Sequence, residues 1–411
     1  MLRGPMMSVA STLRRSRFGC VPARRSLARA FSTTHYCTVD RETNIEAWKD
    51  AASNISWSTP FDQVLDDSKS PFVRWFPGGK LNTCFNCLDR HIINGFGEQN
   101  AIIFESPVSG VQEFWTYNKL HSEVSRLSQV LLERGVEKGD RVLIYMPNTP
   151  QAAAAMLACA RIGATHCVVF GGFASNELAV RIRDCRPRVI IYSSCGLEGT
   201  KVIHYQPLVE EALALVAGPH EDDGQHVSSC IIYQRSQGLV TLNRDRDVDW
   251  TEALAKYQPF EPGAGCVDVE SSHPLYILYT SGTTGAPKGV VRDNGGHAVA
   301  LAWAMSSVYG ISPGETWWAA SDVGWVVGHS FGVYAPLLHR ATTVIYEGKP
   351  VGTPDAGKFW SIASEHKVAA MFTAPTALRA IKRVDPGALL VQGHDLTGLR
   401  TLFLAGERAG V

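Results

Sequence analysis

Acidic side chains are missing from the first 31 residues of this 411-residue chain, and the first one in the whole sequence is Asp40. The same segment is rich in Ser and carries seven arginines: Arg3, Arg14, Arg15, Arg17, Arg24, Arg25 and Arg29. This composition is typical of a mitochondrial transit peptide, so we expect residues 1–31 to be a disordered leader that directs the protein to the mitochondrial matrix. A basic tail without that role is the alternative. A secretory signal is not expected, because no uninterrupted apolar core follows the charges.

A net charge is also lacking, since 39 basic side chains balance 39 acidic ones. Without residues 1–31, 32 basic side chains face 39 acidic ones. Proteins that coat nucleic acid need clustered positive charge. The sequence therefore predicts no nucleic-acid partner.

No apolar run is long enough to cross a bilayer, because the Ala-rich stretch at residues 151–162 is far too short. The ten cysteines are spread irregularly, and a mitochondrial or cytosolic address predicts free thiols. Cys84 and Cys87 form a single C-x-x-C motif. A zinc site would need a second pair at suitable spacing, so no metal site is predicted.

What the chain does contain is an alternation of strands and helices. Residues 40–100, rich in Trp, Pro and Asn, predict a wrapping segment with few long regular elements. Beyond it, Thr116 is a suitable N-cap for a helix that Gly135 ends. The pattern then predicts strands at 141–146, 166–170 and 189–192, with helices at about 150–162 and 175–184. Residues 217–250 are polar surface connections interrupted by a short strand at 230–233. This order predicts an α/β fold with a parallel sheet covered on both faces.

The strongest local signal is YTSGTTGAPKG at residues 279–289, which follows an apolar run at 275–279 that predicts a buried strand. Glycine permits the tight turn, and successive N–H groups of such a turn can surround an anion. The hydroxyls and Lys288 suit the phosphates of a nucleotide; a turn without function is the alternative. The segment is not a Walker A loop, because Lys288 is not followed by Ser or Thr. The candidate phosphate residues are Ser281, Gly282, Thr283, Thr284, Gly285 and Lys288.

This segment resembles the phosphate loop of the acyl- and aryl-adenylate-forming superfamily. Other segments resemble its acetyl/propionyl-CoA synthetase branch: NCLDRH at 86–91, VFGGF at 169–173, SDVGWVVGHS at 321–330, YEGKP at 346–350 and TAPTALR at 373–379. The resemblance runs from about residue 48 to the last residue. It implies an N-terminal segment at 40–100, and an AMP-binding large domain at 101–411 made of parallel sheets covered by helices. On this resemblance we expect the given chain to be incomplete at the C-terminus of that domain and to lack the C-terminal lid domain.

The resemblance also implies roles for individual residues. Lys288 and Thr280 would be catalytic, and Gly406, Glu407 and Arg408 would lie beside the adenosine. The CoA-binding residues would be Leu178, Ala179, Val180, Arg181, Val327 and Val351, with Arg181 pairing with a phosphate. For Arg181, a surface arginine without a ligand is the alternative.

The acyl pocket would consist of Trp325, Val326 and Val327, flanked by Asp322 and His329. Core packing of the valines and a purely structural His329 are the alternatives. Acetate-type members commonly have Thr at 327, Asn at 351 and Pro at 408. Val327, Val351 and Arg408 therefore favour a propionyl-type enzyme.

The activity implied by the resemblance is ligation of a short-chain acid to CoA. The carboxylate would attack the α-phosphorus of ATP, with Mg²⁺ present and pyrophosphate released, and the CoA thiol would then attack the acyl-adenylate. The chain stops before the Thr-Glu motif, the ribose-binding Asp and the acylation lysine of the family. We therefore expect the 411-residue chain alone to form little acyl-adenylate, and a catalytically inactive nucleotide-binding module is the second hypothesis. A P-loop kinase is excluded by the missing Gly-Lys-Ser/Thr sequence.

Overall fold

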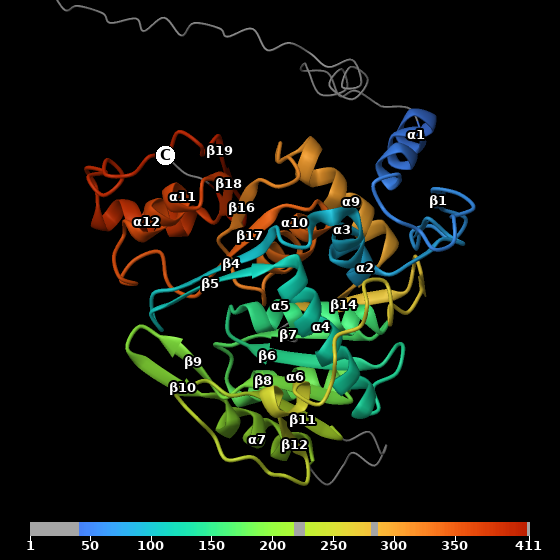
Figure 1. Ribbon diagram of the computed structural model, residues 1–411, viewed down its shortest axis with the longest axis horizontal. Helices are drawn as coiled ribbons and strands as arrows, with labels where there is room; N and C mark the ends of the chain where they lie inside the picture. The colour runs from blue at the N-terminus through green and yellow to red at the C-terminus, as the bar shows by residue number, and fades with distance from the viewer. Residues whose placement is uncertain (1–40, 218–226, 281–286, 409–411) are drawn as a thin grey trace, which may run out of the picture. The chain divides into compact units, whose positions relative to one another are not determined.

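The computed structural model describes residues 41–217, 227–280 and 287–408 (Figure 1). The chain divides into two compact units, residues 1–49 and 50–411. Of the first unit, the structure describes only the beginning of helix α1 (Arg41–Ala52). The candidate site lies entirely in the second unit.

The larger sheet of the second unit has seven strands, all parallel except its last edge strand. Their order is β12 (Asp247–Asp249), β11 (Ser229–Tyr233), β8 (Val189–Ser193), β6 (Arg141–Met146), β7 (Thr165–Phe170), β14 (Pro274–Thr280) and β15 (Lys288–Asp293). Strand β15 pairs antiparallel with β14. The strands predicted from the sequence at 141–146, 166–170, 189–192, 230–233 and 275–279 are confirmed within one residue at each end.

A second sheet of six strands was not located by the local sequence patterns, although the resemblance implied more than one parallel sheet. Its order is β19 (Thr401–Leu404), β18 (Val368–Thr373), β16 (Thr316–Ala319), β17 (Thr342–Tyr346), β4 (Asn100–Ser106) and β5 (Val111–Thr116). Only β5 runs antiparallel to its neighbour. Three two-stranded sheets complete the strands: β1 (Leu65–Asp66) with β2 (Arg74–Trp75), β3 (Lys80–Leu81) with β13 (Val269–Glu270), and β9 (Cys195–Glu198) with β10 (Lys201–His204). The predicted class, an α/β fold of mainly parallel sheets with helices, is confirmed.

Helices connect the strands of both sheets. The described helices of the second unit are α2 (Thr83–Cys87), α3 (Asp89–His91), η3 (Ile92–Phe96), α4 (Tyr117–Glu133), α5 (Pro150–Arg161), α6 (Ser175–Cys185), α7 (Tyr205–Val216), α8 (Trp250–Leu254), α9 (Gly295–Ser307), η4 (Val327–Tyr334), α10 (Ala335–Leu338), α11 (Lys358–Glu365) and α12 (Pro375–Val384). No helix among the described ranges is long and apolar enough to span a membrane.

Helix α4 shows how local sequence sets the boundaries of an element. The hydroxyl oxygen of Thr116 accepts a hydrogen bond from the backbone N–H of Lys119 at 3.1 Å, which satisfies one of the free donors of the first turn. Leu120 and Val124 on its apolar face are fully buried. Gly135, with φ of +76°, lies just beyond the helix end in a conformation that favours glycine. The predicted N-cap and stop are both confirmed.

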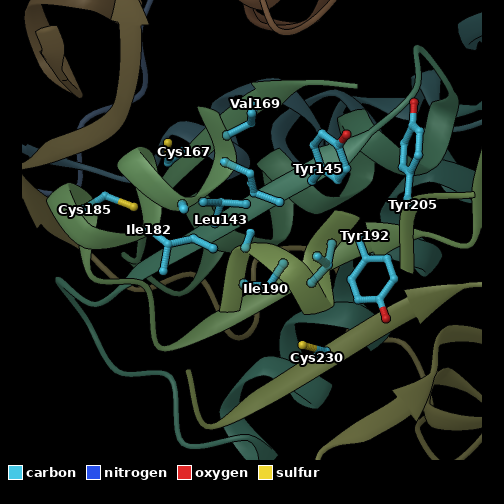
Figure 2. Close-up of a cluster of buried hydrophobic side chains, with 14 of the residues drawn as sticks. Leu143, Tyr145, Cys167, Val169, Ile182, Cys185, Ile190, Tyr192, Tyr205 and Cys230 are labelled. Atoms are coloured by element: carbon cyan, nitrogen blue, oxygen red, sulfur yellow. The ribbon is translucent and has the colours of Figure 1, made fainter. Parts of the chain in front are cut away.

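The core of the seven-stranded sheet lies between its strands and helices α6 and α7 (Figure 2). Leu143 and Tyr145, which are two positions apart on β6, both point into this cluster because side chains alternate between the two faces of a strand. Tyr145 packs on Tyr205 of α7 with ring centroids 4.6 Å apart. His166 of β7 instead contacts Tyr334, whose hydroxyl reaches the carbonyl of Met156 in α5. Both faces of the sheet are therefore covered, as predicted.

A buried charge cluster fixes the segment before residue 100 to helix α5. Arg161 donates to both carboxylate oxygens of Asp89 at 2.9 Å, and neither side chain is exposed. Burial acts to raise the pKa of Asp89, but hydrogen bonds from His121 and Arg161 hold it at about 2. Arg161 also contacts the Sγ of Cys84 at 3.7 Å, and both Cys84 and Cys87 are buried free thiols in α2. These two cysteines pack the helix, as the resemblance implied.

Candidate functional site

A cavity of about 460 Å³ lies where parallel strands of both sheets reach their carboxyl ends. Its walls are the segments that follow β6, β7, β16 and β17, namely residues 147–148, 170–172, 320–322 and 346–350. In open α/β sheets, ligands bind in the crevice outside the carboxyl ends of the strands, and this volume is usual for a small-molecule site. The cavity is therefore the strongest candidate site of the described residues.

Two of the recognised sequence segments meet at one wall of the cavity. Gly324 approaches Phe170 so closely that a Cβ on Gly324 would lie 2.8 Å from the Phe170 Cα. The Phe170 and Trp325 rings lie 5.7 Å apart, and Phe173 packs edge-on against Trp325 at 6.4 Å. The loop after β7 and the loop after β16 therefore form one aromatic surface, which requires glycine at 324.

Asp322 lines the cavity, and its Oδ1 accepts a hydrogen bond from the backbone N–H of Gly324 at 2.7 Å. Burial raises the pKa of Asp322 to about 6; the bond from Gly324 opposes this rise, and the charge of Glu347 adds to it. Within the described ranges, no lysine or arginine forms an ion pair with Asp322. The turn therefore presents an unneutralised carboxyl group to the cavity.

Glu347, another carboxylate that lines the cavity, is neutralised. Arg235 donates to its Oε1 at 2.6 Å and its Oε2 at 2.8 Å, and both side chains are only 6% exposed. Ser106 donates a third bond to Glu347 at 2.7 Å. A bidentate pair of this kind holds the carboxylate in one position and neutralises its charge. Glu347 is therefore a fixed polar group of the cavity wall.

The predicted phosphate segment is flanked by two paired antiparallel strands, β14 and β15. Thr280 ends β14, Lys288 begins β15, and the two residues are cross-strand partners with exposed side chains. The apolar strand predicted before the turn is confirmed as β14. Ser281, Gly282, Thr283, Thr284 and Gly285 lie outside the described residues, so their anion-binding role stays a prediction.

The predicted adenosine segment, Gly406 to Arg408, is held by the beginning of α12. The backbone N–H of Thr376 donates to Glu407 at 2.7 Å, and Arg379 forms an ion pair with the same carboxylate at 2.5 Å. Arg379 also donates to the Arg408 carbonyl at 3.3 Å. Gly406 has φ of +97°, which turns the chain after β19. The segments TAPTALR and Gly406–Arg408, separate in the sequence, are thus in direct contact.

The predicted CoA-binding stretch lies on α6. Leu178 and Ala179 pack in the core of the seven-stranded sheet, so their side chains are not available to a ligand. Val180 is 38% exposed, whereas Arg181 is only 5% exposed. The Arg181 guanidinium lies 4.5 Å from the centroid of the Phe173 ring.

Arg181 is not a surface arginine, the alternative allowed by the sequence. It donates to the Glu177 carboxylate at 2.8 Å and also lies over Tyr279, the residue before Thr280. The Tyr279 hydroxyl donates to Asp184 on the same helix. Helix α6 is therefore linked to the end of β14, and whether Arg181 meets a CoA phosphate stays a prediction.

The predicted acyl-pocket residues lie beside the cavity. Trp325 and Val326 are 47% and 50% exposed, and Val327 begins η4. Val351 packs against the core of the six-stranded sheet. None of these four is among the residues that line the 460 Å³ cavity, although Trp325 contacts two residues that do, Phe170 through its ring and Asp322 through its backbone N–H.

His329 is a satisfied structural group, one of the two alternatives left by the sequence. Its Nδ1 lies 3.1 Å from the Val323 carbonyl, so that nitrogen carries the proton and Nε2 accepts from His166 at 3.1 Å. Burial lowers the pKa of His329 to about 4. The ring is neutral at ordinary pH and holds the carbonyl of the turn that carries Asp322.

Sequence reasoning did not identify several residues of the cavity. Asn148 donates to the Tyr346 carbonyl at 2.9 Å, and its Oδ1 accepts from the N–H of Val323 at 3.3 Å. Arg235, which holds Glu347, comes from a polar stretch that was interpreted as a surface connection. Glu347 itself lies in the YEGKP segment, and the resemblance of that segment to the synthetase branch was the one sequence feature that pointed to this residue.

Residues 90–411 match the family model of the AMP-binding enzyme, and residues 42–87 match that of the acetyl-coenzyme A synthetase N-terminus. Among curated proteins, the chain is 54% identical over 365 residues to acyl-CoA synthetase short-chain family member 3, mitochondrial, of Homo sapiens, covering 89% of this chain and 52% of that protein. It is 42% identical over 360 residues to the propionate–CoA ligase of Escherichia coli (strain K12), covering 88% and 55%.

A third relative is acyl-CoA synthetase short-chain family member B, mitochondrial, of Dictyostelium discoideum, with 44% identity over 386 residues that cover 93% of this chain and 55% of that protein. The chain thus spans about half the length of the curated relatives it matches.

Proposed function

This chain belongs to the AMP-binding enzyme family, and from that premise we propose that it takes part in joining a short-chain carboxylic acid to CoA at the expense of ATP. The reaction passes through an acyl-adenylate and releases pyrophosphate and then AMP. Its partners are small molecules: the acid, ATP and CoA.

One observation carries the proposal. The cavity at the carboxyl ends of both parallel sheets is walled by the loops that carry VFGGF and SDVGW, two segments that resemble the acetyl/propionyl-CoA synthetase branch. Residues 154 positions apart thereby share one aromatic surface at the Phe170–Gly324 contact. A cavity between loops of this kind can hold reacting groups together, which is the main task of an enzyme whose substrates supply both nucleophile and leaving group.

In the first step, the acid carboxylate attacks the α-phosphorus of ATP. Lys288 and Thr280 lie on either side of residues 281–287 and face each other as cross-strand partners of β15 and β14. The positive charge of Lys288 and the N–H groups of residues 281–285 would stabilise the charge on the leaving pyrophosphate. Gly406, Glu407 and Arg408 would lie against the adenosine.

In the second step, the CoA thiol attacks the acyl carbonyl and AMP leaves. Val180 and Arg181 of α6 would meet the nucleotide end of CoA, and the cavity would admit its narrow arm. The hydrogen bond between Tyr279 and Asp184 joins this helix to β14, the strand before the phosphate segment. The proposed CoA site and the proposed ATP phosphate site would therefore lie on elements that are directly connected.

Mg²⁺ would accompany ATP, and it takes most of its ligands from phosphates and water. Within the described residues, the group with metal-binding spacing is Glu105, Glu365 and His366. Lys358 lies 3.1 Å from Glu105, and its positive charge opposes a bound cation. This group therefore does not fit the metal of the reaction, and no protein ligand is assigned.

For the acid, we propose propionate ahead of acetate. Val327, Val351 and Arg408 each differ from the residue common in acetate-type enzymes. One methylene is worth only about 1–3 kcal/mol of discrimination in an apolar pocket, so acetate would be a slower substrate and not an excluded one. We also propose a mitochondrial matrix location from residues 1–31, which lie outside the described residues.

The test is isotope exchange between pyrophosphate and ATP, catalysed by the protein that contains this chain, with acetate, propionate or butyrate added. We expect exchange that depends on the acid and is fastest with propionate, and acyl-CoA formation when CoA is added. ATP binding without acid-dependent exchange would contradict the proposal and favour the inactive nucleotide-binding hypothesis, which no structural observation supports.

A further inference from the structure

Two of the three carboxyl groups that line the cavity, Glu347 and Asp322, are in opposite electrostatic states. Glu347 is paired with Arg235 through two bonds and with Ser106 through a third. Asp322 receives one neutral bond, from the N–H of Gly324, and no ion pair among the described residues. A buried carboxyl group without a cation holds a proton more readily than an exposed one. The fold thus stabilises one carboxylate and leaves the other free to exchange a proton.

The position of Asp322 is fixed from both sides. Its backbone belongs to the turn that also contains Val323. The N–H of Val323 donates a hydrogen bond to Asn148, and the carbonyl of Val323 accepts one from His329. Its side chain lines the cavity, next to the loop 170–172. An acceptor that is rigidly held in a narrow cavity is the arrangement that general base catalysis needs.

The remaining titratable groups around this cavity do not share the role. Lys349 forms an ion pair with Glu198 at 2.5 Å, which lowers the pKa of Glu198. Burial raises the pKa of Tyr205 and of Tyr346 above the ordinary tyrosine value. Behind the turn, burial keeps His329 neutral with a pKa of about 4. Burial instead raises the pKa of Asp322 to about 6, so it is the cavity group whose charge changes between pH 5 and 7.

We propose that Asp322 is the general base of the thioester-forming step and accepts the proton of the CoA thiol. This inference rests on the proposed function and names the residue that would accept the proton in its second half-reaction. The step balances without a further reactant. The S–H bond breaks as the proton passes to an Asp322 oxygen, the sulfur electron pair forms the bond to the acyl carbon, and the bond from that carbon to the AMP phosphate oxygen breaks. AMP leaves with the bonding pair, and Asp322 then returns its proton to water.

The substitution Asp322→Asn tests the proposal, because the amide oxygen can still accept the bond from Gly324 but cannot take up a proton. We expect propionate-dependent pyrophosphate exchange to stay within about threefold of the native rate, which also reports a folded protein. Single-turnover transfer from preformed propionyl-adenylate to CoA should fall by about 100-fold at pH 7. The Kd for CoA, measured by calorimetry, should be unchanged.

The pH profile separates a base from a structural acceptor. In the native protein, the transfer rate should rise through about pH 6 and then level off, as Asp322 ionises. In the Asp322→Asn variant it should climb about tenfold per pH unit toward the thiol pKa of about 8.5, because the thiolate must form unaided. Glu198→Gln is the matched control, because it removes another carboxylate that lines the cavity, one already paired with Lys349, and it should retain the native profile.

Two results would overturn the proposal. One is equal transfer rates for the variant and the native protein. The other is a weaker CoA affinity with an unchanged pH profile, which would make Asp322 a binding group for the CoA arm. Failure of the native protein to exchange pyrophosphate at all would instead contradict the proposed function, so the two failures are distinguishable.

Discussion

Arg161 is a fully buried cation that joins α5 to the N-terminal segment through Asp89. Removing one partner of such a pair leaves an uncompensated charge in the interior. We predict that Arg161→Met lowers the free energy of unfolding by about 3–5 kcal/mol, measured by urea denaturation. Arg244→Met is the matched control: Arg244 pairs with Glu252 on the surface, and its loss should not measurably change stability.

The same pair gives a pH dependence with a definite sign. The pKa of Asp89 is about 2 in the folded protein against 3.8 ordinarily, so the folded state favours the ionised form. The resulting stability is complete above about pH 4 and is lost as the pH falls toward 2. Arg161→Met should therefore flatten acid unfolding over that window; an acid transition as steep as that of the native protein would contradict this account.

Lys288 begins β15 directly after the phosphate turn, opposite Thr280. We predict that Lys288→Gln lowers acid-dependent pyrophosphate exchange by about 100-fold, because a transition-state charge loses its cationic partner. The matched control is Arg292→Gln on the same strand, which removes an exposed positive charge four residues away. Equal losses in both variants would mean that general surface charge, and not Lys288, is responsible.

At the scale of elements, the loops after β7 and β16 depend on one close approach. A methyl group at residue 324 would lie 2.8 Å from the Phe170 Cα, a backbone atom that cannot move aside on its own. We predict that Gly324→Ala separates the two loops and lowers kcat/KM for propionyl-CoA formation by about 10- to 100-fold, since a displacement of about 1 Å can cost that much.

Gly332→Ala is the control for that prediction. Gly332 lies in η4, a few residues farther along the chain, and a Cβ there would have no atom within 4 Å. Its kcat/KM should match that of the native protein. A Gly324→Ala enzyme with native kinetics would show that the Phe170–Trp325 wall does not position the substrates.

At the scale of the whole molecule, we propose that residues 1–31, which have seven arginines and no acidic residue, direct the protein to the mitochondrial matrix. We predict that these residues, fused to a fluorescent protein, carry it into the mitochondrial matrix. Replacing the seven arginines with glutamine should leave the fusion in the cytosol, because import leaders depend on their positive charge. Cytosolic fluorescence of the unaltered fusion would contradict the location.

The elements of the larger sheet followed from local patterns. Apolar runs, the Thr116 cap and the glycines after helices mark boundaries within a few residues of chain, and all five predicted strands are present in the structure. The second sheet was not recognised as separate because β4 and β17 pair across 240 residues. Nothing in a local pattern distinguishes a strand of one parallel sheet from a strand of another.

By itself, the sequence determined the α/β class, the buried strand before the phosphate segment and the membership in the AMP-binding enzyme family, because each depends on a short ordered run of residues. Only the tertiary structure decided that Arg181 is buried, that Glu347 is neutralised by Arg235 and that Asp322 is not. These states arise from contacts between residues up to 241 positions apart, such as Ser106 and Glu347. The charge and burial of a side chain depend on which distant segments fold against it, and that is a property of the packed molecule.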